Sequence, residues 1–161
     1  MSKLRLTHFD KKGAARMVDV SEKELSERVA VAKGSVTMKR ATLDLVRKGK
    51  AKKGDVLAVA RLAGIMGAKR TSDLVPLTHP LALASINVDL VCNAKRNAVD
   101  ITATCKLKGR TGVEMEALTA VAVAALTVYD MLKAVDRGMK LSDIRLMHKS
   151  GGKSGVFEAP A

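Results

Sequence analysis

Three charged side chains in one long apolar stretch have a spacing that could serve chemistry: Glu116, Asp130 and Lys133. The residues from Val113 to Val135 include neither proline nor glycine, and Gly138 follows them, which predicts one helix. On that helix Glu116 and Asp130 share a face but lie about 21 Å apart, at 1.5 Å per residue. They cannot both contact one small reacting centre. If both are functional, they hold different parts of a large ligand or meet sites completed by different chains.

The same helix carries signals for its start and its burial. Thr111 and Glu114 have the spacing of a capping box, which marks a helix start. Residues 118–132 are apolar on nearly every side, so we expect them to be buried. Asp130 and Lys133 are three residues apart and can meet directly. Two interpretations of this pair are equally supported: the residues are functional, or they form an ion pair where the helix reaches the surface.

His79 is the strongest single candidate outside this helix. Pro76 and Pro80 restrict the backbone on both sides of it, which predicts a stiff loop within residues 68–80. A lone histidine is more often structural than catalytic, but a loop that holds the ring in place favours function. His8, His79 and His148 are scattered along the chain, so we expect no metal site.

Lys53 precedes a predicted helix from Asp55 to Gly67, with Asp55 as its N-cap. The helix dipole and the neighbouring Lys52 both disfavour the charged form of Lys53, which would suit general acid–base catalysis. A solvated charge run is the plainer interpretation. The tail from Ser150 to Gly155 resembles part of a P-loop but lacks the first glycine and a following helix. It can still bind an anion through its backbone N–H groups.

The remaining elements give the fold class. Apolar alternation and turn residues predict a strand at 28–36, a short helix at 40–48, a hairpin of 86–92 and 99–107, and a last strand at 141–147. With the two longer helices this is the βαββαβ order of a ferredoxin-like α+β fold, an antiparallel sheet with helices on one face. No element remains for the other face, so we expect an oligomer in which another subunit covers it.

Length and composition bound the class of protein. The 161 residues fit a single domain, 1–161, with flexible ends at 1–15 and 150–161. We see no apolar run near the ~20 residues of a membrane span and no signal peptide, so we expect a cytoplasmic protein without a membrane partner. Cys92 and Cys105 lack C-x-x-C spacing and should remain free thiols.

The chain is strongly basic, with 29 Lys and Arg against 16 Asp and Glu, a net charge of +13. Such a charge attracts nucleic acid, a membrane surface or a phosphorylated small molecule. Proteins that bind single-stranded nucleic acid usually stack its bases on aromatic side chains. The aromatic residues of this chain are Phe9, Tyr129 and Phe157. We therefore expect no nucleic-acid partner. A basic, non-catalytic nucleic-acid-binding module remains the alternative.

Seven runs of residues, in order along nearly the whole chain, resemble one known family. They are RMVDVS at 16–21, KGDV at 53–56, AKRT at 68–71, LTHPL at 77–81, TGVEMEA at 111–117, YDM at 129–131 and KSGGKSG at 149–155. These runs are similar to those of the cyclic pyranopterin monophosphate synthases, the C-protein family of molybdenum cofactor biosynthesis.

The resemblance implies a ferredoxin-like fold and a homohexamer, a trimer of dimers with active sites at a subunit interface. It implies a lyase that converts (8S)-3′,8-cyclo-7,8-dihydroguanosine 5′-triphosphate to cyclic pyranopterin monophosphate and releases pyrophosphate. Carried over motif by motif, Asp130 would be the catalytic acid/base, with Lys53 and Lys133 as catalytic or orienting lysines. The substrate-binding residues would be Arg28, Leu77, Thr78, His79, Glu114, Met115 and Glu116.

Two residues depart from the family pattern. Thr78 stands where the family usually has cysteine, so a nucleophilic thiol is not required at that position. Val156 stands where the tail usually has aspartate, which puts any role of that acid in doubt. We expect no required cofactor, although Mg²⁺ can accompany the triphosphate. We also expect that Lys53 and Asp130 of one reaction come from different subunits.

Overall fold

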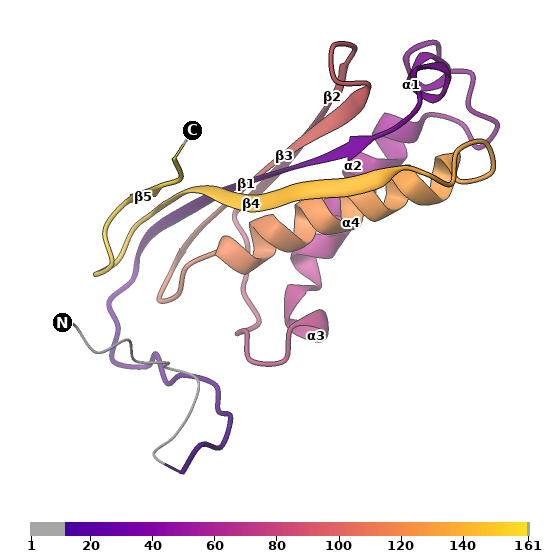
Figure 1. Cartoon of the computed structure of the whole chain (residues 1–161). Helices are drawn as coiled ribbons and strands as arrows, with labels where there is room; N and C mark the ends of the chain where they lie inside the picture. The colour runs from indigo at the N-terminus through magenta and orange to yellow at the C-terminus, as the bar shows by residue number, and fades with distance from the viewer. Residues whose placement is uncertain (1–11, 161) are drawn as a thin grey trace.

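Alternating apolar residues form the strands of one antiparallel sheet, shown in Figure 1 by a computed structural model that describes residues 12–160. The strands are β1 (Ser26–Thr37), β2 (Ser85–Asn93), β3 (Ala98–Gly109), β4 (Lys140–Ser150) and β5 (Phe157–Glu158). They lie in the order β2-β3-β1-β4-β5, so that β1 pairs with both β3 and β4. β2 and β3 form the predicted hairpin.

The helices are α1 (Arg40–Arg47), α2 (Val56–Lys69), α3 (Thr71–Leu74) and α4 (Glu114–Leu132). α2 and α4 pack against each other on one face of the sheet (Figure 1). The ferredoxin-like α+β prediction is therefore confirmed, and α3 and β5 are elements that the sequence did not predict. The single domain, the flexible ends and the oligomer stay predictions, and residues 1–11 and 161 lie outside the described part of the chain.

The sheet face beneath the helices supplies most of the core. On β3 every second residue is buried there: Val99, Ile101, Ala103, Cys105 and Leu107. Both cysteines are free, as predicted. Burial raises the pKa of the Cys105 thiol to about 12, so this cysteine stays protonated and serves as a small apolar residue.

Small residues let α4 approach its neighbours closely. A Cβ atom at Gly67 of α2 would lie 2.8 Å from Cγ2 of Val123, and one at Gly64 would lie 2.9 Å from the carbonyl oxygen of Ala120. On the sheet side, a Cβ at Gly34 of β1 would lie 2.6 Å from Cγ1 of Val121. Contacts this short leave no room for a methyl group, so these glycines set the position of α4.

Two local predictions about helix starts had different outcomes. Asp55 caps α2 as predicted, because its side chain accepts a hydrogen bond from the backbone N–H of Ala58 at 3.0 Å. The capping box at α4 is wrong: the N-cap is Val113, without a side-chain cap. Glu114 instead accepts a hydrogen bond from Lys149 of β4 at 2.6 Å, and no described hydrogen bond joins its carboxylate to the backbone of Thr111.

Among the described residues, α4 is the one helix long and apolar enough to cross a membrane, with a mean hydropathy of 1.5. More than half of it, 56%, is buried inside the protein. Its neighbours are α2 on one side and the strands β1, β3 and β4 on the other. A buried position between a helix and a sheet is that of a core helix.

Replacing Gly67 by alanine tests the close approach of α2 and α4. We expect Gly67→Ala to lower the free energy of unfolding by about 1–3 kcal/mol, because the new methyl group overlaps Val123. In a Val123→Ala background the overlap with Cγ2 disappears while the contact with Cβ at 2.9 Å remains, so the same change should cost less stability. Urea denaturation of the four proteins measures both effects. Equal effects of Gly67→Ala in the two backgrounds would contradict the overlap.

Candidate active site

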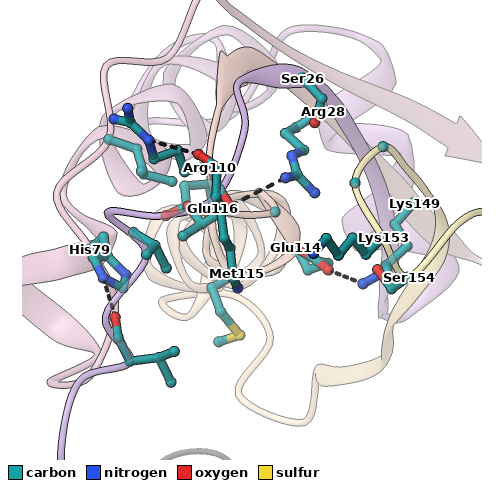
Figure 2. A pocket seen from close by; sticks show the side chains of 18 of the residues that line it. Ser26, Arg28, His79, Arg110, Glu114, Met115, Glu116, Lys149, Lys153 and Ser154 are labelled. Atoms are coloured by element: carbon teal, nitrogen blue, oxygen red, sulfur yellow. Dashed lines mark hydrogen bonds and ion pairs between the residues drawn. The ribbon is translucent and has the colours of Figure 1, made fainter.

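A cavity of about 720 Å³ lies at the N-terminal end of α4 (Figure 2). Residues from five regions line it: the segment before β1, the start of β1, the loop before β2, the start of α4 with the turn before it, and the end of β4 with the following glycine loop. All seven predicted substrate-binding residues are among them: Arg28, Leu77, Thr78, His79, Glu114, Met115 and Glu116. The structure thus brings together residues that are up to 88 positions apart, from 28 to 116.

Arg28 is a buried cation at this cavity, with 8% of its surface exposed. Its guanidinium donates from Nε to the carbonyl oxygen of Gly109 and from Nη2 to that of Arg110, both at 3.2 Å. Gly152 of the tail lies against it in a left-handed conformation, φ +70°, and a Cβ there would be 1.8 Å from Nη1. Within residues 12–160 no carboxylate pairs with this guanidinium, so its charge suits an anionic ligand.

Glu114 and Glu116 begin α4 but have different environments. Glu114 accepts a hydrogen bond from Lys149 Nζ at 2.6 Å. Glu116 is buried, with 4% exposed, and no described cation pairs with its carboxyl. Burial is the largest cause that raises the pKa of Glu116 above its ordinary value, and the nearby charge of Glu114 adds to it. Glu116 can therefore hold a proton at a higher pH than an exposed glutamate.

The loop before β2 places His79 and Thr78 on another wall of the cavity. His79 Nε2 lies 2.9 Å from the carbonyl oxygen of Val18, which can only accept, so Nε2 carries the hydrogen. This bond ties the segment before β1 to the loop. The Thr78 hydroxyl donates to the carbonyl oxygen of Val75 at 2.8 Å, a contact that shapes the loop.

The three predicted catalytic residues form a second group, the Asp130 cluster, at the other end of α4. Lys53 Nζ donates to Oδ2 of Asp130 at 2.9 Å and to its backbone carbonyl oxygen at 3.0 Å. Lys133 Nζ lies 2.8 Å from Oδ1 of Asp130. Hydrogen bonds from Lys133 and Lys53 lower the pKa of Asp130 to about 2, and Asp130 in turn raises that of Lys133. At neutral pH Asp130 is therefore a carboxylate that can accept a proton but has none to give.

One prediction about these residues is wrong. We expected Lys53 and Asp130 of one reaction to come from different subunits, yet they form an ion pair within one chain. From the sequence we considered only Lys52 and the helix dipole as neighbours of Lys53. Tertiary packing also brings the negative charge of Asp130 to Lys53. Asp130 and Lys133 do form the predicted i,i+3 pair.

The cavity and the Asp130 cluster remain separate in one chain. Glu116 and Asp130 are 14 residues apart on α4, which corresponds to about 21 Å along its axis. None of the three cluster residues lines the cavity. About half of each cluster side chain is exposed: 49% for Lys53, 56% for Asp130 and 53% for Lys133.

Sequence reasoning missed several residues of the cavity wall. Val18 and Val20 belong to the segment before β1, from which we named no binding residue. Lys149, Gly151, Gly152 and Lys153 come from the glycine-rich tail, from which we named no individual substrate-binding residue. Counting these, five cations line the cavity: Lys23, Arg28, Arg110, Lys149 and Lys153. The two adjacent glycines and the two lysines of the tail are the sequence features from which this side of the cavity could have been predicted.

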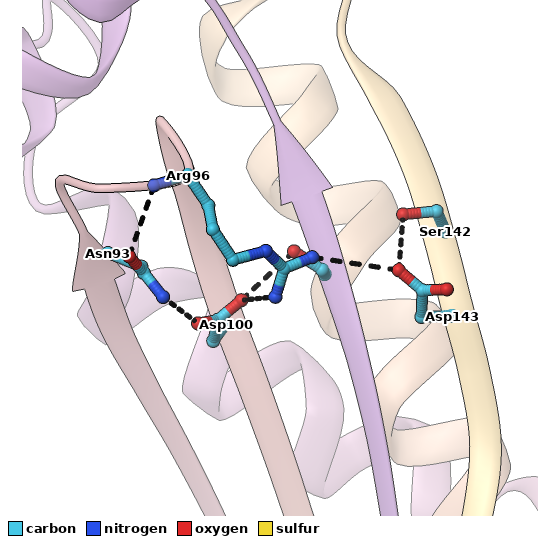
Figure 3. A network of polar contacts seen from close by, with 6 residues as sticks. Asn93, Arg96, Asp100, Ser142 and Asp143 are labelled. Carbon is cyan, nitrogen blue, oxygen red and sulfur yellow. Dashed lines mark hydrogen bonds and ion pairs between the residues drawn. The ribbon is translucent and has the colours of Figure 1, made fainter. Parts of the chain in front are cut away.

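The sheet face away from the helices bears on the nucleic-acid alternative. The pairing register of the strands shows that no aromatic residue of β1–β5 lies on that face. Nucleic-acid bases would therefore find no aromatic side chain of these strands to stack on there. One of its cations, Arg96, is held by carboxylates: Nη1 lies 3.1 Å from Asp100 and Nη2 lies 3.6 Å from Asp143 (Figure 3). Asp100 also accepts hydrogen bonds from Ser35 and Asn93. These contacts offset the charge of Arg96 on this face.

Within residues 12–160 no group of three or more His, Cys, Asp or Glu side chains is placed to hold a metal ion. The expectation that no cofactor is required stays a prediction.

The ferredoxin-like chain has a cavity in which five cations lie around a buried glutamate, an arrangement whose charge suits a protein that binds an anionic ligand. Comparison with known proteins identifies the family: residues 17–152 match the model of the MoaC family. The chain belongs to the MoaC family.

Relatives from three bacteria carry the name cyclic pyranopterin monophosphate synthase. The protein of Dinoroseobacter shibae is 64% identical over 96% of this chain and 98% of its own length. That of Rhodospirillum rubrum is 66% identical over 96% and 93%, and that of Thermomicrobium roseum is 61% identical over 94% and 92%. The similarity therefore extends over both the cavity and the Asp130 cluster.

Replacing each of the two glutamates of α4 by neutral glutamine should change the stability of the protein in opposite directions. Because the pKa of Glu116 is raised in the folded state, its ionisation costs stability once the pH exceeds the unfolded value of 4.5. Glu116→Gln should therefore gain melting temperature relative to wild type as the pH rises above 4.5, and the difference should level off above the raised pKa of the folded state. Glu114→Gln, which breaks the contact with Lys149, should lower it. Calorimetry across this pH range measures both. A Glu116→Gln difference that stays constant with pH would contradict the buried ionisation.

Proposed function

We propose that this chain is a cyclic pyranopterin monophosphate synthase of molybdenum cofactor biosynthesis. It converts (8S)-3′,8-cyclo-7,8-dihydroguanosine 5′-triphosphate to cyclic pyranopterin monophosphate and releases pyrophosphate, which makes it a lyase. The observation that carries the proposal is the set of relatives with this name, 60–66% identical over 94–99% of the chain. The grouping of the matched residues into one cavity and one cluster supports it.

The charges fit a triphosphate substrate. Forming a cyclic monophosphate from a triphosphate joins a substrate hydroxyl oxygen to the α-phosphorus, while the bond from that phosphorus to the pyrophosphate oxygen breaks. The hydroxyl loses its proton and the leaving pyrophosphate gains negative charge, which lysine and arginine side chains stabilise. The cavity supplies five such cations and the Asp130 cluster supplies two.

The two carboxyl groups suit different proton transfers. Asp130, whose pKa is about 2, is ionised and suited to accept a proton or to orient its two lysines. Glu116, whose pKa is raised by burial, is suited to donate one. Environments that push two carboxyl pKa values apart are a common basis for dividing acid and base roles. Arg28, His79 and Met115 would hold the substrate beside Glu116, and Thr78 would shape the loop instead of acting as a nucleophile.

We further propose that a complete site combines the cavity of one chain with the Asp130 cluster of another. The separation of about 21 Å along α4 supports this arrangement, because one chain cannot bring both groups to one reacting centre. The exposure of the cluster leaves it free to face a second subunit. A homohexamer built as a trimer of dimers would supply such contacts and would cover the open sheet face.

The remaining proposals concern the setting of the reaction. No resident cofactor is needed, and Mg²⁺ could enter with the triphosphate. We propose that the chain acts in the cytoplasm, where a nucleotide-derived substrate is available, without a nucleic-acid or membrane partner.

Pyrophosphate release from the cyclised nucleotide tests the reaction. The purified protein should release one pyrophosphate per substrate, and Asp130→Asn should reduce kcat by at least about a hundredfold, ~2.7 kcal/mol of barrier. Salt-sensitive retention of oligonucleotides, measured in parallel, tests the nucleic-acid alternative. Oligonucleotide binding at physiological salt without pyrophosphate release would overturn the proposal.

Mixing two inactive variants tests the composite site. Glu116→Gln damages the cavity and Lys53→Ala damages the Asp130 cluster, so each protein alone should be nearly inactive. After dissociation and joint reassembly, some sites would combine an intact cavity with an intact cluster, and activity should return. Lys53→Ala mixed with Asp130→Asn is the matched control, because both lesions lie in one cluster and no complete site can form. Recovery in the control, or none in the test mixture once mass spectrometry confirms mixed assembly, would contradict this arrangement.

A further inference from the structure

Asp136 is a buried acid outside both parts of the proposed site, in the turn between α4 and β4, with 2% of its surface exposed. Its carboxylate accepts three hydrogen bonds. Oδ2 accepts from the backbone N–H of Lys39 at 2.9 Å and from the Thr42 hydroxyl at 3.1 Å. Oδ1 accepts from the backbone N–H of Gly138 at 3.1 Å. Burying a carboxylate is costly unless donors of this kind surround it.

Two of these three donors belong to the start of α1. The N-cap of α1 is Lys39, whose own side chain makes no capping hydrogen bond. Asp136 supplies the acceptor from a position 97 residues further along the chain. A negative charge at a helix N-terminus also interacts favourably with the helix dipole. Asp136 therefore fixes the first turn of α1 to the segment that follows α4.

The chain that starts at this cap returns to the same segment at Lys53. After α1, a loop with Gly49 and Gly54 in left-handed conformations leads to the start of α2. Lys53 in that loop donates to the carboxylate and the backbone carbonyl oxygen of Asp130, near the C-terminal end of α4. Figure 1 shows α1, this loop and the α4–β4 turn at one end of the molecule.

Residues 39–53 are thus attached to residues 130–138 at two points. One is the buried hydrogen-bond group of Asp136, and the other is the exposed contact of Lys53 with Asp130. Exposed ion pairs contribute little to stability and do not hold long side chains in place alone. Of these two polar attachments the buried one is therefore the stronger, and it acts together with the buried Leu43 and Val46 of α1 to fix where the loop of Lys53 lies.

We propose that Asp136 is a positioning residue for catalysis, which acts by holding α1 and the following loop so that Lys53 contacts Asp130. The proposal rests on the proposed function, in which the Asp130 cluster carries catalytic side chains. Asp136 itself contacts none of the three cluster side chains through a described hydrogen bond or ion pair and need not touch the substrate.

The titration of Asp130 tests the proposal independently of turnover. In Asp136→Ala, loss of the Lys53 contact should raise the pKa of Asp130 from about 2 toward the ordinary value of 3.8. Removing a neighbouring negative charge by itself can only lower that pKa, so a rise identifies the lost contact. Carbon-13 NMR of labelled aspartate carboxyls measures it. Turnover of the cyclised nucleotide should lose at least about tenfold in kcat, with KM less changed because the cavity is intact.

A matched pair of threonine variants separates positioning from stability. Thr42→Val removes one hydrogen bond to Asp136, and Thr71→Val removes hydroxyl bonds to the carbonyl oxygens of Gly67 and Ala68. Both threonines are buried, with 4% and 1% exposed. We expect similar losses of melting temperature, but a raised Asp130 pKa and a lower kcat only in Thr42→Val.

These variants also decide the outcome if Asp136→Ala does not fold. An Asp130 pKa still near 2 in every folded variant at Asp136 or Thr42 would overturn the positioning role. If the wild type releases no pyrophosphate, the proposed function fails, while the NMR titration still decides whether Asp136 holds Lys53 in place.

Discussion

The close contact of α4 with α2 and the sheet is the constraint on which the rest of the structure depends. Gly34, Gly64 and Gly67 lie where any side chain would overlap α4. They let a helix of alanines and valines fill the space between α2 and β1 with almost no aromatic residue. Because interiors are packed as densely as crystals, this contact fixes both the rotation and the depth of α4. It therefore fixes where Glu116 and Asp130 lie.

A rigid helix with a polar group at each end divides the chemistry into two places. The N-terminal end contributes Glu114, Met115 and Glu116 to a cavity, and the C-terminal end presents Asp130 and Lys133 at the surface. The helix is too long for the two ends to meet in one chain. This separation is the observation behind the proposed site between subunits, in which each chain would supply one half of two different sites.

The basic charge of the chain also has a divided role. Some cations are held by specific acids, as Arg96 is by Asp100 and Asp143, and Lys149 is by Glu114. Others line the cavity without such a partner, and Arg28 is the most buried of them. A net charge of +13 by itself could not distinguish a nucleic-acid surface from a cavity for a phosphorylated molecule. The arrangement of the cations around a concave site favours the second.

The sequence by itself determined the order of elements, the hairpin, the N-cap of α2 and seven of the residues that line the cavity. These follow from local periodicity, from turn and capping chemistry, and from motifs that resemble a known family.

The sequence could not determine which residues far apart along the chain contact each other in the fold. The capping box failed because Lys149, 35 residues away, holds Glu114. The assignment of Lys53 and Asp130 to different subunits failed because packing brings together residues 77 positions apart. The cap that Asp136 provides for α1 is of the same kind. Contacts between distant residues depend on how whole helices and strands pack, and spacing along the chain carries no record of that.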